Sequence, residues 1–368
     1  MPVDVPIRAV TVGAYRVPTA TPESDGTLEW HATTLVVVHA AAGDATALGY
    51  TYADAATARL VHDLLRDVVV GRDALAPTAA WDAMVQAIRN LGRPGVASMA
   101  IAAVDNALWD LKARLLDLPL CTLLGAVRDA VPVYGSGGFT SYSIPELTGQ
   151  LSEWVGQGIR RVKMKVGRDA AADPARVHAA RRAIGDAELF VDANGGYARK
   201  QALALAERFA ADGVSWFEEP VSSDDLAGLR LLRDRVPAGM EVTAGEYGYD
   251  LGYFRAMLEA GAVDVLQADA TRCAGITGFM RVAALCEAFR VPLSSHCAPA
   301  LHAHACCAAT PVRHLEYFFD HVRLERMLFD GSPSPQDGLL APDLSRPGLG
   351  LALRNADARR YAVHGAGS

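Results

Sequence analysis

The 368-residue sequence lacks the long apolar runs and the basic stretches that mark two large classes of protein. No apolar run reaches about 18 residues without a polar interruption, so we expect no membrane-spanning helix. The first residues, Met1-Pro2-Val3-Asp4, show no basic segment followed by an apolar one, so we expect no signal peptide. The net charge of -7, without a basic stripe, argues against a nucleic-acid partner.

The cysteines also lack a recognisable pattern. There is no CxxC pair, so we expect no structural zinc site, and no spacing suggests a disulfide framework. This usage favours a reduced, cytoplasmic chain. The six positions are Cys121, Cys273, Cys286, Cys297, Cys306 and Cys307.

What the sequence has is an even, globular composition and room for more than one domain. Hydrophobic residues make up 51% of the chain and charged residues 21%. Residues 1–128 mix strand and helix patterns, with strands expected at Ile7–Val12, Thr34–His39 and Gly49–Tyr52, a polar loop at Pro18–Trp30 and a helix at Ala97–Leu116. Residues 326–368 are rich in Pro and Gly and read as a tail returning over this first unit, with Tyr361–Val363 as a possible edge strand.

Residues 129–325 carry a repeating unit of one apolar run followed by one helical stretch. Strands that alternate with helices predict a parallel sheet, and eight such units in about 200 residues predict a closed (β/α) barrel. The connection over residues 298–311 is short but long enough for a helix. The expected strands are Val131–Tyr134, Arg161–Val166, Leu189–Asp192, Ser215–Glu218, Glu241–Ala244, Val263–Ala268, Val291–Ser294 and His314–Tyr317.

Polar residues of catalytic type stand at the ends of seven of these runs, and a parallel barrel brings all such ends to one mouth. Asp192, Glu218 and Glu246 end consecutive strands, and three converging carboxylates predict a Mg²⁺ site. Separate acids at helix N-termini are the alternative. Strand phase leaves Glu218 or Glu219 as the ligand, and Asn194 is a candidate supporting residue.

Lys163 and Lys165 lie two apart on one strand, so both point to the same face. Mutual repulsion is expected to lower the pKa of at least one and prepare it as a base. Two solvated lysines at a strand edge are the alternative. Asp269 and His296 end neighbouring strands, and a carboxylate beside an imidazole makes a competent acid or base.

Glu316 ends the last strand and is a candidate for a protonated carboxyl that donates a hydrogen bond to a developing oxyanion, with a structural ion pair as the alternative. His302 and His304 are expected to be ordinary polar residues of a helix rather than metal ligands. Cys297 is expected to pack rather than react.

The ordered set Lys-x-Lys, Asp-Ala-Asn, Glu-Glu-Pro, Gly-Glu, Gln-Ala-Asp, Ser-Ser-His and Leu-Glu-Tyr resembles the enolase superfamily, and more closely its mandelate racemase/muconate lactonizing enzyme branch. The resemblance covers nearly the whole chain. It implies an α/β fold: a modified TIM barrel below an α+β capping domain at residues 1–128, in a homo-oligomer. The polar loop over residues 18–30 would close over the site, and Arg272, where the racemase has a lysine, receives no role.

The resemblance also implies roles for the residues. It makes Glu218 rather than Glu219 the third Mg²⁺ ligand with Asp192 and Glu246. Lys165 becomes the base on one face of a small carboxylate substrate, with Lys163 beside it. His296, paired with Asp269, would stand on the opposite face of the substrate. Glu316 would form a hydrogen bond to the substrate carboxylate.

Such a site removes the proton next to a carboxylate and leaves an enediolate. The polar covering segment favours dehydration of an acid sugar, an aldonate or aldarate, to a 2-keto-3-deoxy acid. Racemisation or epimerisation of a 2-hydroxy acid is the alternative. Cycloisomerisation and epimerisation of an amino-acid derivative are less favoured, and a non-catalytic metal-binding barrel is a remote possibility.

Overall fold

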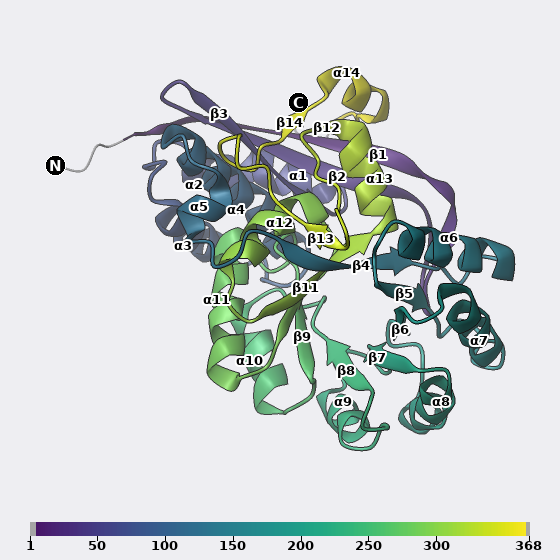
Figure 1. Ribbon diagram of the computed structural model, residues 1–368. Coiled ribbons are helices and arrows are strands. Elements are labelled where there is room, and N and C mark those ends of the chain that lie inside the picture. The colour runs from purple at the N-terminus through teal and green to yellow at the C-terminus, as the bar shows by residue number, and fades with distance from the viewer. Residues whose placement is uncertain (1–4, 366–368) are drawn as a thin grey trace.

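The computed structural model describes residues 5–365, and its N-terminal part is an antiparallel sheet covered by helices (Figure 1). The sheet has the order β1 (Ile7–Ser24), β2 (Glu29–Ala42) and β3 (Ala45–Tyr52), which confirms the expected third strand. The segments that follow are α1 (Ala56–Leu60), the π-helix η1 (Val61–Leu65), α2 (Arg66–Val69), α3 (Pro77–Ala87), α4 (Val96–Leu115) and α5 (Leu120–Leu124).

Helix α4 packs directly on this sheet because both surfaces are built from small residues. A Cβ at Gly49 in β3 would lie 2.1 Å from the backbone nitrogen of Ala107, so only glycine permits this approach. Asn106 donates to Tyr50 O and accepts from Ile276 N. The helix therefore joins the sheet to the start of a barrel helix.

The expected loop over residues 18–30 is wrong, because most of this segment is a β-hairpin. β1 and β2 continue past Pro18 and pair again at Glu23 with Trp30, with a register irregularity between the two pairs. β1 is an edge strand, where proline costs no ladder hydrogen bond, and the irregularity accommodates Pro22. Only a tight turn remains, in which the Asp25 carboxylate accepts the Thr27 and Leu28 amides.

The larger part of the chain is an eight-stranded parallel barrel with helices outside, as the sequence predicts. β11 pairs with β4 and closes it, while the short β13 (Leu339–Leu340) adds to β4 in antiparallel fashion. The strands are β4 (Val131–Gly137), β5 (Arg161–Lys165), β6 (Glu188–Asp192), β7 (Val214–Glu218), β8 (Glu241–Ala244), β9 (Val265–Ala268), β10 (Leu293–Ser295) and β11 (Val312–Phe318).

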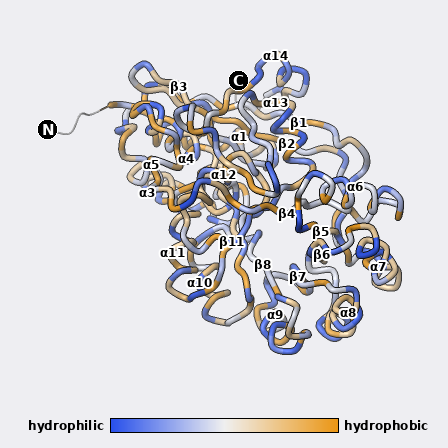
Figure 2. The backbone as a smooth tube through the Cα atoms, in the orientation of Figure 1, coloured by the Kyte–Doolittle hydropathy of each residue, from blue (hydrophilic) through white to orange (hydrophobic). Residues whose placement is uncertain are grey.

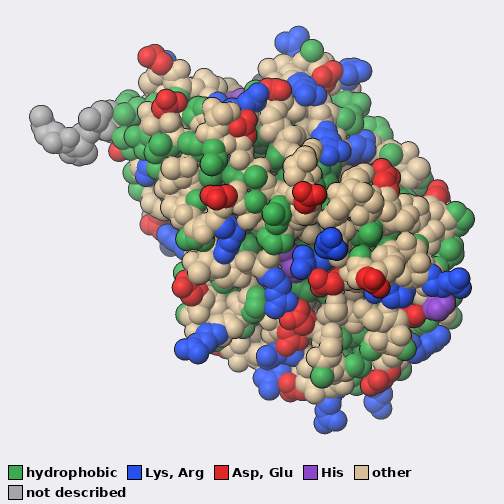
Figure 3. Space-filling model, viewed as in Figure 1, with side chains coloured by type: hydrophobic (Ala, Val, Ile, Leu, Met, Phe, Trp, Pro, Cys, Tyr) green, Lys and Arg blue, Asp and Glu red, His purple; other side chains and the backbone are tan. Residues whose placement is uncertain are grey.

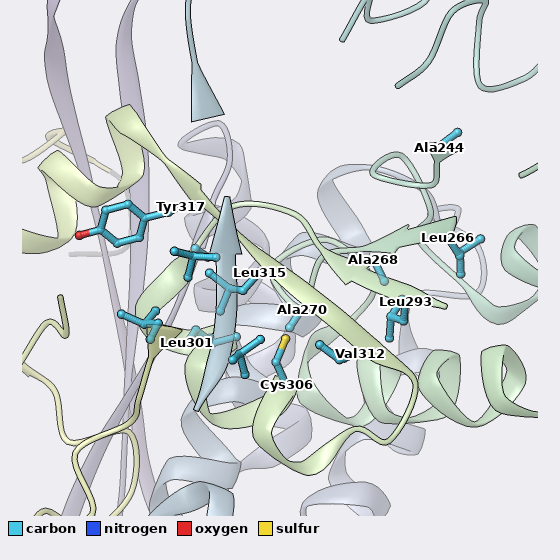
Figure 4. Close-up of a cluster of buried hydrophobic side chains, with 14 of the residues drawn as sticks. Ala244, Leu266, Ala268, Ala270, Leu293, Leu301, Cys306, Val312, Leu315 and Tyr317 are labelled. Atoms are coloured by element: carbon cyan, nitrogen blue, oxygen red, sulfur yellow. The ribbon is translucent and has the colours of Figure 1, made fainter. Parts of the chain in front are cut away.

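Helices between the strands bury apolar faces against the barrel wall. Figure 4 shows Leu315 near Leu301 and Cys306 of α12, with Leu293 and then Leu266 of the neighbouring strands farther along the barrel wall. Figure 2 shows the hydrophilic outer colouring of segments such as α9 and α14. The barrel helices are α6 (Ile144–Gly156), α7 (Asp173–Ile184), α8 (Arg199–Ala211), α9 (Leu226–Arg233), α10 (Leu251–Glu259), α11 (Gly275–Phe289) and α12 (Pro299–Ala308).

The C-terminal segment crosses both parts of the molecule. Its elements after α13 (Phe319–Leu328) are β12 (Phe329–Asp330), β13, β14 (Ala352–Leu353), α14 (Asn355–Ala358) and the 3-10 turn η2 (Arg359–Tyr361). The expected edge strand Tyr361–Val363 is confirmed only in its position: Ala362 forms a bridge with Tyr15 of β1 and the Val363 amide donates to Ala14 O, but Tyr361 belongs to the 3-10 turn and no strand forms. Among residues 5–365, no helix combines the length and apolar character needed to span a bilayer.

The turn between β1 and β2 lies so close to the barrel that a substitution at its glycine, Gly26, tests this contact. A Cβ at Gly26 would lie 2.1 Å from Ala193 O and 2.8 Å from Val166 O. We expect Gly26→Ala to displace the turn, at a cost of about 1–3 kcal/mol, and to speed amide hydrogen exchange at Thr27 and Leu28 at least tenfold. Gly149→Ala, on a helix with nothing within 4 Å, is the control and should leave exchange unchanged. Equal exchange in both variants would contradict this docking.

Candidate active site

The site is a cavity of about 480 Å³ between the barrel mouth and the capping domain. Its barrel wall comes from strand ends, and its roof includes hairpin residues such as Trp30 and Thr33. On the face seen in Figure 3, acidic and basic side chains are interspersed rather than gathered into one large patch of either sign. The predicted residues that line the cavity are Lys165, Glu246, Asp269, His296 and Glu316.

The two-residue alternation of the strands sorts the barrel interior into layers. Phe190 and Trp216 stack with ring centroids 5.0 Å apart and form an apolar floor. Asp192 and Glu218 follow these rings by two residues, so their carboxylates lie one layer nearer the mouth. This phase turns Glu218, rather than Glu219, toward the interior.

Asp192, Glu218 and Glu246 form the candidate metal site. One oxygen from each lies within 4.8 Å of the others, and all three side chains are buried. Burial and the neighbouring Asp192 raise the pKa of Glu218 to about 8. Among the described residues, Glu246 Oε2 has no hydrogen-bond partner although it is buried.

The donor set fits a hard divalent cation. Burial of several carboxylates in one place is unfavourable unless positive charge compensates them. Asp192, Glu218 and Glu246 supply only oxygen ligands, which suits Mg²⁺, and the orphan Glu246 oxygen is available for it. The buried carboxylates around the mouth are Asp192, Glu218, Glu219, Glu246, Asp269 and Glu316, whereas the basic side chains paired with them, apart from His296, are Lys163, Lys165 and Arg272.

Neither lysine has the lowered pKa that the sequence analysis expected, although Lys163 does act to lower the pKa of Lys165. Lys163 Nζ lies 2.6 Å from Glu218 Oε1 and 2.8 Å from Glu316 Oε1, and Lys165 pairs with Asp192. Burial lowers the pKa of each lysine, but these carboxylates raise it by more, so both values lie above the ordinary range. Repulsion between like charges is outweighed because carboxylates lie closer to each amine, and Asp192 contacts both.

Asp269 and His296 form the expected pair, with His296 Nδ1 2.8 Å from Asp269 Oδ2. The other Asp269 oxygen accepts the Thr271 amide at 2.6 Å. Burial lowers the pKa of His296, while Glu246 and Asp269 raise it above its ordinary value. The imidazole Nε2 lies 3.4 Å from Glu246 Oε2, so the pair adjoins the carboxylate cluster.

Of the two alternatives for Glu316, a protonated carboxyl and an ion pair, its contacts in this structure favour the ion pair. Burial raises the pKa of Glu316, but Lys163 and His296 lower it well below the ordinary value. Glu316 Oε2 also accepts the Cys297 amide at 2.8 Å. Of the two left-handed residues that follow His296, only Cys297 directs its amide to this carboxyl group, because the Ala298 amide donates to His321 Nδ1. The contacts of Glu316 with Lys163 and with the Cys297 amide suit a carboxylate.

Some residues considered in the sequence analysis have no catalytic role; some of them are held by structural contacts and others line the cavity. His302 accepts the Ala270 amide at Nε2, and His304 accepts the Cys121 amide, so both are fixed by backbone contacts. All six cysteines are free and buried. Cys297 Sγ lies 3.2 Å from His296 Nε2. Arg272 lines the cavity and reaches Glu246 Oε1 at 3.2 Å.

Several residues that line the cavity were missed in the sequence analysis, among them His321. It lines the cavity from the start of α13, five residues after Glu316. Its position in the sequence could have identified it, because the chain that leaves the last barrel strand starts at the mouth of the barrel.

Comparison with known proteins agrees with this geometry. Residues 9–125 match the family described as "Mandelate racemase / muconate lactonizing enzyme, N-terminal domain", and residues 146–358 match "Enolase C-terminal domain-like". A 3,6-anhydro-alpha-L-galactonate cycloisomerase of Streptomyces coelicolor is 35% identical, with 97% of this chain and 99% of the relative covered. An L-talarate/galactarate dehydratase of Salmonella typhimurium is 30% identical, with coverage of 85% and 78%.

Solved structures show the same likeness. A mandelate racemase/muconate lactonizing enzyme-like protein from Rubrobacter xylanophilus superposes with a TM-score of 0.95 at 56% identity, covering 97% of this chain and 99% of the other. A racemase from Streptomyces coelicolor with bound magnesium gives 0.91 at 33% identity, covering 97% and 100%.

Removal of one carboxylate should weaken the metal site selectively. We expect Asp192→Asn to lower Mg²⁺ affinity at least 100-fold, because a neutral amide replaces an anionic ligand, and to abolish the rise in melting temperature that Mg²⁺ causes. Calorimetry on chelator-treated protein measures the affinity. Asp54→Asn, in the same cavity but exposed, is the control. Undiminished Mg²⁺ binding by the Asp192 variant would place the ion elsewhere.

Proposed function

Because the chain belongs to the mandelate racemase/muconate lactonizing enzyme family of the enolase superfamily, we propose that it removes the proton alpha to the carboxylate of an acid sugar and then eliminates an oxygen from the β-carbon. The observation that carries this proposal is the placement of two proton-transfer groups. Lys165 ends β5 and His296 follows β10, on nearly opposite walls of the barrel with the acidic cluster between them.

Lys165 is the proposed base. A proton next to a carboxylate is only weakly acidic, so its removal requires stabilisation of the charge that develops on the carboxylate oxygens. Mg²⁺, held by Asp192, Glu218 and Glu246, supplies that stabilisation when bound. A cation that draws Asp192 toward itself also weakens the ion pair of Lys165, which favours the neutral amine that a base requires.

Lys163 is proposed to attract the substrate carboxylate, and Glu316 positions Lys163. Lys163 is fully buried and held by two carboxylates, so it is a fixed positive charge at the floor of the mouth. Glu316 is held in turn by the Cys297 amide. Their mutual contact sets the place of the charged amine before substrate arrives, which lowers the cost of orienting it.

His296 is the proposed acid for the second step. Asp269 orients its ring and favours the protonated form, so Nε2 can deliver a proton to the departing β-hydroxyl. The α-proton passes to Lys165, and the β-hydroxyl leaves as water with the proton from His296, so the substrate loses H⁺ and OH⁻, the elements of one water. The resulting enol becomes a 2-keto-3-deoxy acid.

The acid-sugar substrate is supported by the relatives and by the cavity. Several relatives carry acid-sugar names, among them an arabinonate dehydratase from Saccharolobus solfataricus and a D-gluconate dehydratase from Thermoproteus tenax. The cavity offers hydroxyl and amide groups from Thr33, Thr34 and Asn194, which suit a hydroxylated chain.

A ring-opening isomerisation is a second candidate. If the β-oxygen belongs to a ring of the substrate, the same elimination opens the ring and leaves the molecular formula unchanged. The similarity to a 3,6-anhydro-alpha-L-galactonate cycloisomerase over almost the full length of both chains favours this version. Racemisation or epimerisation requires the same two groups but no elimination.

A library experiment separates these outcomes. The protein is incubated in D₂O with Mg²⁺ and with aldonates, aldarates and anhydro-aldonates, and products are followed by mass spectrometry and a 2-keto-acid assay. Dehydration gives a keto acid with loss of water, and ring opening gives one without it. Deuterium at the α-carbon without a keto acid selects the racemase or epimerase. The absence of both keto acid and α-proton exchange would contradict the proposal.

The two proton-transfer groups should fail in different ways. With a substrate from this library, we expect Lys165→Ala to lose α-proton exchange and turnover by about 10³-fold or more. We expect His296→Asn to lose keto-acid formation by a similar factor but to keep measurable α-proton exchange, which NMR in D₂O detects.

Exposed residues provide the matched controls. Lys200→Ala and His178→Asn remove a lysine and a histidine from the outer surface and should retain normal turnover. Retention of exchange by Lys165→Ala together with its loss in His296→Asn would reverse the assigned roles.

A further inference from the structure

His321 presents a polar atom to the cavity that the proposed chemistry does not use. The residue lies three positions after Phe318, where β11 ends, and its side chain is only 8% exposed. It lines the cavity together with Tyr52 of the capping domain. His321 therefore faces the substrate from the junction of the two domains.

The ring is held in one orientation by three contacts. It stacks on Tyr52, with centroids 3.4 Å apart and an interplanar angle of 15°. Phe318 meets it edge-on at 5.1 Å and 85°. The Ala298 amide donates to His321 Nδ1 at 3.3 Å. A side chain fixed in this way loses little freedom when a ligand binds, so its hydrogen bond costs little to form.

The contact with Ala298 also determines which nitrogen carries the proton. Nδ1 accepts a hydrogen bond, so in the neutral ring the proton is on Nε2. Burial lowers the pKa of His321 well below its ordinary value, which keeps the ring neutral near pH 7. Within residues 5–365, Nε2 has no hydrogen-bond partner and is not among the fully enclosed unpartnered atoms, so it faces the open cavity.

We propose that His321 is a specificity-determining residue whose Nε2–H donates a hydrogen bond to an uncharged oxygen of the substrate, a hydroxyl or ring oxygen on the part of the carbon chain nearest the capping domain. A neutral donor suits an uncharged acceptor, whereas the carboxylate end is bound by Lys163 and the metal site. The assignment rests on the proposed function, because an acid sugar supplies such oxygens along its chain.

Two substitutions separate the cavity contact from the contact with Ala298. In His321→Asn the amide oxygen takes the place of Nδ1 and can still accept the Ala298 amide, but no donor reaches the place of Nε2. In His321→Gln the terminal NH₂ reaches the place of Nε2, but the acceptor for Ala298 is lost. A purely structural role predicts that the asparagine variant behaves more like wild type, and substrate recognition predicts that the glutamine variant does.

The test compares these variants on a polyhydroxy acid that the wild type binds and on its single-deoxy analogues. Where the acid is turned over, KM and kcat are measured, and where it is only bound, calorimetry with Mg²⁺ gives Kd. We expect His321→Asn to weaken binding of the full acid about tenfold, with little change in kcat and in Mg²⁺ affinity. One deoxy analogue, the one that lacks the oxygen bound by His321, should bind wild type and His321→Asn equally. His321→Gln should bind the full acid almost as tightly as wild type does.

The outcomes distinguish this assignment from the proposed function. A full acid that binds but undergoes neither exchange nor elimination contradicts the proposed function alone, and its Kd values still decide the role of His321. If all deoxy analogues lose as much affinity in His321→Asn as the full acid does, or if His321→Gln is the weaker variant, the assignment is overturned.

Discussion

The excess of buried carboxylate at the barrel mouth is the constraint on which the rest of the site depends. Three strands end in acids above an aromatic floor, and water cannot solvate them there. Lys163 and Lys165 compensate part of this charge through contacts with the carboxylates. The negative charge left on the carboxylates favours a bound cation. The contacts of each lysine with these carboxylates also determine how basic that lysine is.

The capping domain contributes to the site through its contacts with barrel loops. α4 buries Asp105 and Asn106 against the start of α11, where Asp105 accepts from Thr277 and Asn106 from Ile276. α11 follows the loop that carries Asp269. Because the Asp269 carboxylate orients His296, its position depends on the packing between the two domains. Gly26 docks the hairpin turn on the opposite side of the mouth.

Much of this arrangement could be predicted from the sequence because it depends on local periodicity. Apolar runs that alternate with helical stretches located all eight barrel strands, and the polar residues at the ends of seven of them identified the acidic cluster and the Asp269–His296 pair. The hairpin was missed because Pro18 and Pro22 indicate a loop, and only the pairing of β1 as an edge strand shows why they are tolerated.

What could not be predicted depends on contacts between distant segments. The pKa values of Lys163 and Glu316 follow from which groups each one touches, and spacing along the chain does not contain that information. The orientation of His321 requires Tyr52, from a strand almost 270 residues earlier. The domain boundaries at residues 128 and 325 and the homo-oligomer stay predictions.

Whether a divalent cation joins the three acids is tested most directly by a crystal structure of the protein grown with Mn²⁺ as an anomalous substitute for Mg²⁺. We expect one strong anomalous peak bonded, at about 2.0–2.3 Å, to an oxygen from each of Asp192, Glu218 and Glu246. A peak at another place, or acids that remain paired only with Lys163 and Lys165 at saturating Mn²⁺, would contradict this proposal.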